Sequence, residues 1–199
     1  EVVEPGGTEC DEDLARACLR IGDVLQAEHL GSSVLVDAHG FHGQNPRMTA
    51  VELSRLAAEL GIDVVGAAPA EPYEDTERHI LERRERGLFA GMRFTMARPE
   101  LSCHPERLLA GARTVVSAAL CYYAPGLDPG VDEARLPRYA WRDHYSDLRQ
   151  RLTELGERLG GSYGVLVDSN DHVDREGAVR SGVAFYGKNT MAITRGFGS

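Results

Sequence analysis

The stretch VDSNDHVDREGAVRSGVAFYGKNT, residues 167–190, places an acid, a helical segment and a glycine turn in succession. Asp168 directly follows the apolar run 165–167, which predicts a buried strand. Residues 176–181 are expected to belong to a helix, and Gly-Lys-Asn at 187–189 to form a tight turn. An acid at the end of a buried strand, followed by a turn that carries a cation, suggests a ligand pocket.

Asp168 admits two interpretations. At the end of a strand, burial favours the protonated form of a carboxyl group, which can then donate a proton to a ligand. Alternatively, Asp168 caps the following helix or closes a turn, helped by its polar neighbours Ser169 and Asn170. Spacing alone favours the structural role, because capping carboxylates are common just ahead of helices.

The turn at 187–189 also admits two interpretations. Gly187 permits a positive φ, and Lys188 is placed to meet a phosphate or an amide-rich ligand. An ordinary surface lysine is the simpler alternative. The stretch is not a Walker A loop, because Asn189 stands where that motif needs Ser or Thr, although Gly182 has the required spacing.

A second chemically dense stretch is RYAWRDHY, residues 138–145, which holds two Arg, two Tyr, a His and the only Trp of the chain. Such a set of side chains can line a pocket for a large, flat, polar ligand. It can equally begin a helix that Asp143 caps. Composition does not decide between these two interpretations.

The rest of the chain alternates helices with strands. Thr49 and Glu52 have the spacing of a capping box, which begins an amphipathic helix that Gly61 ends. Further helices are expected at 74–86 and 145–159, and buried strands at 62–70 and 114–123. This succession predicts a mixed α/β (α+β) domain.

The first 47 residues differ in charge from the remainder. They hold nine acidic residues and three arginines, against 22 acidic and 19 basic residues in 48–199. The capping signal directly after Met48 makes a clean start for a domain. We therefore expect residues 1–47 to be an atypical N-terminal extension outside the core, although 32–40 reads as a short strand, and residues 48–199 to form the main domain.

Composition limits the class of protein. A hydrophobic content of 42% and a charged content of 27% are ordinary for a globular domain, and the net charge of −9 excludes a uniformly basic nucleic-acid surface. No apolar run approaches the roughly 20 residues that span a bilayer, so we expect no membrane association and a cytoplasmic location. The four cysteines are too scattered for a locally encoded zinc or iron–sulfur site, so no metal ligand is predicted in the chain: Cys10, Cys18, Cys103 and Cys121.

Four stretches, taken in order, resemble the N-terminal part of the epoxyqueuosine reductases, the cobalamin-dependent enzymes of queuosine synthesis in tRNA. They are LAAELGIDVVGAAPAEP at 56–72, GMRFTMARPELSCHPERLLAGARTVVSAALCYY at 91–123, RYAWRDHYSDLRQRL at 138–152, and the stretch at 167–190. Together they are spread over nearly the whole of 48–199, from residue 56 to residue 190. The resemblance implies a nitroreductase-like cobalamin-binding domain with a mixed sheet flanked by helices.

The resemblance also implies an activity, the reduction of epoxyqueuosine to queuosine at the tRNA wobble position with cobalamin and 4Fe–4S clusters. Asp168 falls on the family's active-site acid, which protonates the departing oxygen. Lys188 and Asn189 fall in the Gly-Lys-Asn turn that contacts the corrin. The other cofactor-binding candidates are Gly187, Ser169, Tyr139, Arg142 and Arg98. The implied partners are a tRNA substrate and an external electron donor.

Two features depart from the family. Its motif Tyr-Ala-x-Gly-x-Asp-Tyr-His reads YAWRDHY here, which leaves the places of His144 and Tyr145 open. The family's cluster ligands lie in a Cys-rich ferredoxin-like segment, expected beyond residue 199, so the chain is expected to be a fragment that is inactive alone. The alternatives are a reductive-dehalogenase-like cobalamin reductase of a small molecule and a non-catalytic corrin-binding module.

Overall fold

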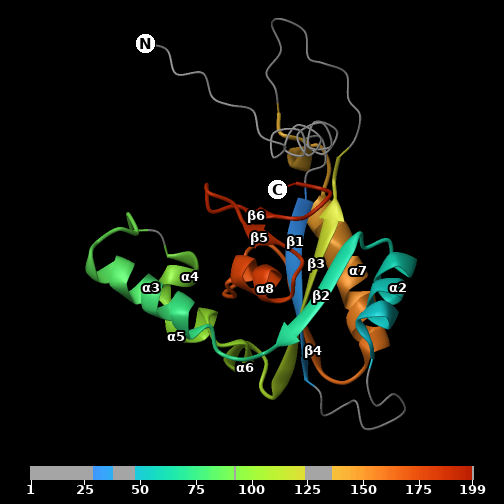
Figure 1. The fold of residues 1–199 in the computed structure, drawn as a ribbon, viewed down its shortest axis with the longest axis horizontal. Helices are drawn as coiled ribbons and strands as arrows, with labels where there is room; N and C mark the ends of the chain where they lie inside the picture. Colours follow the sequence, from blue (N-terminus) through green and yellow to red (C-terminus); the bar gives the residue numbers. More distant parts are fainter. Residues whose placement is uncertain (1–28, 38–47, 92, 124–135, 199) are drawn as a thin grey trace, which may run out of the picture.

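The computed structural model describes residues 29–37, 48–91, 93–123 and 136–198. A four-stranded sheet lies at the centre, with helices on both faces and a helical lobe beside it (Figure 1). The strands are β1 (His29–Asp37), β2 (Val64–Pro69), β3 (Ala112–Cys121), β4 (Tyr163–Leu166), β5 (Phe185–Tyr186) and β6 (Ala192–Ile193). The helices are α2 (Ala50–Glu59), α3 (Glu74–Glu85), α4 (Phe94–Ala97), α5 (Pro99–Ser102), α6 (Pro105–Leu108), the 3₁₀ turn η2 (Arg138–Ala140), α7 (His144–Leu159) and α8 (Asp174–Arg180). The expected mixed α/β class is confirmed.

The sheet has the strand order β2-β3-β1-β4, and every pairing among these four strands is antiparallel. Residues 115–120 of β3 are all buried, because both faces of this strand are covered. The resemblance implied a mixed sheet, whereas the described sheet is antiparallel throughout. The reason is the position of β1, which separates β3 from β4 and runs opposite to both.

Strand β1 also corrects the expected domain boundary. Residues 29–37 belong to the segment 1–47 that was expected to lie outside the core, yet β1 is an interior strand of the sheet. Leu35 and Val36 are 1% and 2% exposed and pack into different clusters, one on each face. The apolar residues of β1 explain why this strand lies inside the sheet, although the residues around it in the sequence are mainly acidic. The rest of that segment, 1–28 and 38–47, lies outside the described residues.

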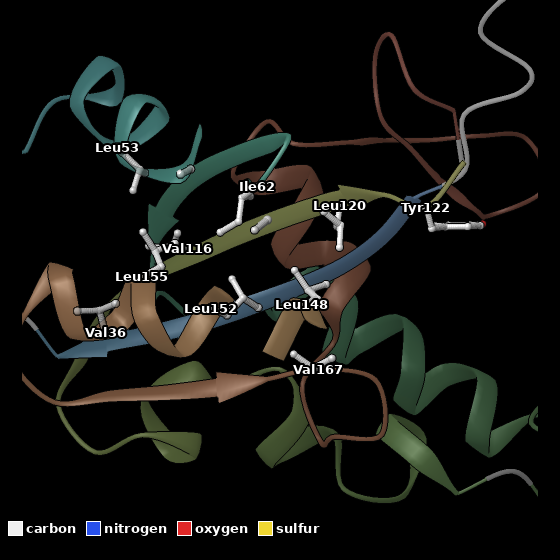
Figure 2. Close-up of a cluster of buried hydrophobic side chains, with 12 residues drawn as sticks. Val36, Leu53, Ile62, Val116, Leu120, Tyr122, Leu148, Leu152, Leu155 and Val167 are labelled. Atoms are coloured by element: carbon white, nitrogen blue, oxygen red, sulfur yellow. The ribbon is translucent and has the colours of Figure 1, made fainter. Parts of the chain in front are cut away.

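The larger core lies between the sheet and helices α2 and α7 (Figure 2). Helix α7 presents one buried face at helical spacing, formed by Leu148, Leu152 and Leu155. Helix α2 adds Leu53 and Ala57 and begins with the predicted capping box of Thr49 and Glu52. Both helices are therefore placed by signals that are local in the sequence.

Helix α8 covers the opposite face of the sheet from α2 and α7 (Figure 1). Gly66 of β2 permits this close approach, because a Cβ there would meet the carbonyl oxygen of Ser181. Beside α8, helices α3–α6 form a lobe around a small cluster of Tyr73, Ile80 and Cys103. Val173 packs against that cluster, so the segment that leads into α8 lies between the sheet and the lobe.

The other local predictions agree with the structure. The helices expected at 74–86 and 145–159 are α3 and α7, and the strand expected at 114–123 is β3. Within the described part of the chain, no helix is both long and apolar enough to cross a membrane.

Candidate active site

Asp168 lies on a loop between β4 and α8, which we call the acid loop (residues 167–173). Val167 is 3% exposed and follows β4, whose residues are half-buried and not buried as was expected, whereas Asp168 is exposed. The expected burial of Asp168 is therefore wrong for the chain by itself. The backbone turns at this residue: Asp168 has a φ of 60°, in the left-handed region that few residues other than Gly, Asn and Asp adopt.

Asp168 does not cap the following helix. The N-cap of α8 is Val173, and no side chain provides a cap hydrogen bond there. Among the described residues, none donates a hydrogen bond to the Asp168 carboxylate or forms an ion pair with it. The helix-capping role is thus wrong, whereas the positive φ and the bend at Asp168 agree with the alternative that this residue closes a turn. The carboxylate itself has no partner among the described residues that would compete with a ligand.

Side chains fix the backbone of the acid loop from two sides. Arg149 of α7 donates a hydrogen bond of 3.0 Å to the carbonyl oxygen of Val167. The Asn170 amide donates to the carbonyl oxygen of Asp168 at 2.8 Å and accepts from the backbone N–H of His172 at 2.7 Å. Sequence analysis named Asn170 only as a polar neighbour and missed Arg149 and His172. Arg149 is contributed by another element, so no local signal could identify it.

Tyr145 is the residue that the structure brings to Asp168. Burial raises the pKa of the Tyr145 phenol, and the charge of Asp168 and the neighbouring Tyr139 raise it further. Tyr145 therefore keeps its proton near neutral pH and lies within electrostatic reach of the carboxylate. Tyr139 is 46% exposed, so the group of Tyr139, Tyr145 and Asp168 opens to solvent.

His144 belongs to the core and not to this group. Its ring packs on Tyr122, with 5.6 Å between ring centroids. Burial, followed by the nearby Arg142 cation, lowers the pKa of His144, so this imidazole is neutral near pH 7. Of these two residues, Tyr145 is the one that interacts electrostatically with Asp168, and His144 packs on Tyr122.

The stretch 138–145 does begin a helix, because Asp143 Oδ1 accepts a hydrogen bond of 2.9 Å from the Ser146 N–H at the start of α7. Ahead of the helix, the Arg138 guanidinium lies 4.8 Å from the ring centroid of Tyr123 and 5.5 Å from that of Trp141. Arg142 is exposed. The capping interpretation is confirmed, and it leaves Tyr139 and Arg142 on the surface.

The turn at Gly187–Asn189, which we call the GKN turn, closes on itself. The Gly187 N–H donates to the Met191 carbonyl at 2.8 Å, and the Thr190 N–H donates to the Gly187 carbonyl at 2.9 Å. Gly187 was expected to adopt a positive φ, but it does not. Instead, a Cβ there would lie 2.7 Å from Ile193 Cδ1 and 2.8 Å from Asn189 Oδ1, so the absence of a side chain permits close packing. The positive φ occurs at Thr190, at 66°.

The side chains around the GKN turn combine a cation with exposed apolar surface. Lys188 is exposed, and among the described residues none pairs with its ammonium group. Phe185, Tyr186 and Met191, on the same hairpin, are 44%, 46% and 40% exposed. Next to the hairpin lies a cavity of about 680 Å³, between α3 and α8. Its lining includes Tyr186, Thr190 and Arg175.

Not all the predicted residues meet in one place. No hydrogen bond or ion pair joins Asp168 to Lys188 or Asn189 in the described part of the chain; the acid loop precedes α8 and the GKN turn follows it. Arg98 lies against the acid loop, with its Nη2 2.8 Å from Asp171 Oδ2. Ser169 is exposed beside Asp168.

The described residues offer no cluster of three or more His, Cys, Asp or Glu side chains that could hold a metal ion. Burial raises the pKa of the Cys103 thiol to about 12, so this cysteine stays protonated and inert. Cys121 is also a free thiol, on β3.

Comparison with known proteins places this geometry in a family context. Residues 103–174, which include the acid loop, match the family model described as epoxyqueuosine reductase QueG, DUF1730. The epoxyqueuosine reductase of Lactococcus garvieae is 30% identical over an alignment of 158 residues, and the match covers 74% of this chain and 44% of the relative.

Solved structures give the same relationship. The structure of epoxyqueuosine reductase from Streptococcus thermophilus superposes with a TM-score of 0.63 at 27% identity, over 74% of this chain and 42% of that chain. An epoxyqueuosine reductase with a tRNA-Tyr epoxyqueuosine-modified stem loop gives a TM-score of 0.58 at 25% identity and covers 75% and 42%. The chain thus spans less than half the length of these relatives. Over about three quarters of its length, this chain is similar in sequence and fold to epoxyqueuosine reductases.

Proposed function

We propose that the chain is the cobalamin-binding and substrate-binding part of an epoxyqueuosine reductase that acts on tRNA. This proposal rests on the exposure and backbone conformation of Asp168, which lies within the matched region 103–174. Its carboxylate is exposed, caps no helix, and is held on a backbone of positive φ beside Tyr145. A strained, internally unpartnered acid on a well-supported loop is typical of a residue kept for chemistry and not for folding.

The reaction converts an epoxide into an alkene and water and consumes two electrons and two protons. Asp168 is the proton donor to the oxygen that leaves, and the neutral Tyr145 phenol holds a second proton close to it. In the free chain Asp168 is exposed. A bound substrate would cover the acid loop, and the loss of water would then favour the neutral, proton-donating form of the carboxyl group.

Cobalamin, when bound, supplies the reducing equivalents for this reaction. A corrin ring presents flat apolar faces and an amide-bearing edge. The hairpin of the GKN turn offers both kinds of partner, since exposed Phe185, Tyr186 and Met191 stand beside Lys188 and Asn189. The residues present therefore fit the group. Lys188 would donate to amide oxygens at the edge, and the exposed Tyr139 and Arg142 would be further partners for the edge.

Electrons must reach the cofactor from outside this chain. The cysteines of this chain are scattered. The match covers less than half of the length of these relatives. We therefore assign the 4Fe–4S clusters and the external donor to a source other than these 199 residues. A cytoplasmic location, where tRNA is modified, accompanies the proposal.

Titration of the chain with cobalamin tests the proposal. We expect a saturable change in the visible absorption of the corrin, and no such change with urea-unfolded chain. If the folded chain, verified by circular dichroism, leaves the corrin spectrum unchanged, the cofactor assignment is wrong. With the cofactor reduced by titanium(III) citrate, the chain should then convert an epoxyqueuosine-containing tRNA stem loop in a single turnover.

A further inference from the structure

A buried chain of hydrogen bonds runs beneath the acid loop. The Tyr73 hydroxyl lies 3.0 Å from His172 Nε2, and His172 Nδ1 lies 3.2 Å from Asp174 Oδ1. Tyr73 is 1% exposed, and the His172 side chain is completely buried. A buried imidazole is costly unless both ring nitrogens are paired, and here both are.

The positions of the protons in this hydrogen-bond network follow from the residues that it joins. Burial raises the pKa of the Tyr73 phenol, so Tyr73 keeps its proton, and its hydroxyl pairs with His172 Nε2. His172 Nδ1 faces the Asp174 carboxylate, which can only accept a hydrogen bond, so Nδ1 carries a proton and donates it. A partner at each ring nitrogen therefore fixes the orientation of the imidazole.

The chain of hydrogen bonds continues to the backbone of Asp168. Asp174 Oδ2 accepts from Asn170 Nδ2 at 3.0 Å, and the same amide nitrogen donates to the Asp168 carbonyl oxygen at 2.8 Å. The carbonyl oxygen of Asn170 receives the His172 N–H. Five residues therefore form one connected network, in order Tyr73, His172, Asp174, Asn170 and Asp168.

The outer end of the network is rigidly held. The Arg180 guanidinium lies 4.4 Å from the ring centroid of Tyr73, and Arg180 is itself ion-paired with Glu176 at 2.8 Å. The Tyr73 N–H donates to the Cys103 carbonyl oxygen at 2.8 Å, and the Val173 N–H donates to that of Ser102 at 3.2 Å. The lobe of α3–α6 thus supports the loop at both Tyr73 and Val173.

We propose that His172, held by Tyr73 and Asp174, is the positioning residue that fixes the acid loop and aims the Asp168 carboxylate. The inference rests on the proposed catalytic role of Asp168, and it assigns to His172 no contact with substrate or cofactor. A loop held at an unfavourable φ returns to other conformations when its support is removed. Loss of the network would therefore misplace the acid without removing it.

Two variants test the role. Tyr73→Phe removes one hydroxyl and preserves the ring that packs on Arg180, and His172→Phe removes both ring nitrogens. The control is Tyr163→Phe, because the Tyr163 hydroxyl on β4 makes no hydrogen bond within the described part of the chain. Hydrogen exchange is read at the amides of His172 and Val173, which the intact loop protects.

We expect both amides to exchange at least about tenfold faster in Tyr73→Phe and His172→Phe, and at the parent rate in the control. The single-turnover rate with reduced cobalamin and the stem loop should fall about tenfold or more, while half-saturation by either ligand stays unchanged. Unchanged exchange at both amides in both folded variants would overturn the inference.

A measurement on the parent chain needs no variant. The ¹⁵N chemical shifts of the His172 ring should report a proton on Nδ1, and an imidazole protonated at Nε2 alone would contradict the network. The proposed function fails separately: if Asp168→Asn turns over like the parent, Asp168 is not the acid, whatever the exchange of the loop amides shows.

Discussion

The two loops that flank α8 are built in opposite ways. The acid loop before the helix uses its own buried and half-buried side chains, together with Arg149 and Tyr73, to hold the backbone around one exposed carboxylate. The GKN turn after the helix is closed mainly by backbone hydrogen bonds and leaves Lys188 without a partner among the described residues. The first arrangement sets the direction of one group, and the second keeps side chains free for a ligand.

This difference leads to a separation of roles. Changes in the acid loop should alter the rate of the chemical step, because they alter the position or identity of one acid. Changes in the GKN turn should alter the affinity for the cofactor. The following predictions test that separation, beginning with the largest effect.

Asp168→Asn should reduce the single-turnover rate by about 10²–10⁴-fold, the usual contribution of a general acid. Asn adopts a positive φ as readily as Asp, so the fold and the affinity for cobalamin should not change. The matched control is Asp171→Asn on the same loop, which breaks only the exposed ion pair with Arg98 and should cost less than about 1 kcal/mol. Similar rate losses for both variants would remove the special role of Asp168.

Gly187→Ala should lower the free energy of unfolding by up to about 1 kcal/mol, because the new methyl group would force the ends of the Ile193 and Asn189 side chains to shift. Urea denaturation measures this directly. Gly164→Ala on β4 is the control, since a Cβ there would meet no atom within 4 Å. If both variants are equally stable, the turn is not closely packed and the comparison of the two loops fails at this point.

Lys188→Met should weaken cobalamin binding by about 1 kcal/mol, roughly fivefold, because one exposed cation contributes little on its own. At saturating cobalamin the single-turnover rate should equal that of the parent. Arg113→Met removes another exposed cation, on β3, and should leave both quantities unchanged. A Lys188→Met variant that binds normally but reacts slowly would reverse the roles assigned to the two loops.

The smallest expected effect is on stability and concerns His104, in the lobe of α3–α6 that supports the acid loop. Burial alone lowers the pKa of His104, but hydrogen bonds to Glu77 and Glu106 outweigh it and raise the pKa above the ordinary value. The stabilisation by this cluster is therefore complete below the ordinary histidine pKa and is lost as the pH rises through the raised pKa. Urea denaturation should show that His104→Gln loses more stability at pH 5.5 than at pH 8.5.

His144 should give the opposite dependence of stability on pH. Its pKa is lowered by burial and by Arg142, so the folded chain loses stability as the pH falls below the ordinary histidine pKa. The stability difference between parent and His144→Gln should therefore shrink on acidification, whereas that for His104→Gln should grow. Parallel pH dependences for the two variants would contradict this assignment of the two imidazoles.

The sequence predicted those features that depend on neighbouring residues. The capping box of Thr49 and Glu52, the helix start at Asp143 and the strand that leads to Asp168 all rest on residues a few positions apart. Features that depend on distant partners were missed. Arg98 pairs with Asp171 across 73 positions, and Tyr73 reaches His172 across 99, so no periodicity encodes either contact.

The same reason explains the wrong expectations. Strand β1 was recognised as a strand but excluded from the core, because its partners β3 and β4 lie far along the chain. The exposure of Asp168 follows from its backbone conformation, which the apolar run 165–167 does not specify. Gly187 was assigned a conformational role, whereas Ile193 packs where its side chain would be. Local patterns identified the candidate residues, and tertiary contacts determine how each is used.

The central claim is that Asp168 serves the chemical step and Lys188 serves binding. The most direct test is the single-turnover rate on an epoxyqueuosine-containing stem loop, measured at saturating reduced cobalamin for Asp168→Asn and Lys188→Met side by side. We predict a loss of about 10²-fold or more for Asp168→Asn and the parent rate for Lys188→Met. Equal rates for the two variants would contradict the claim.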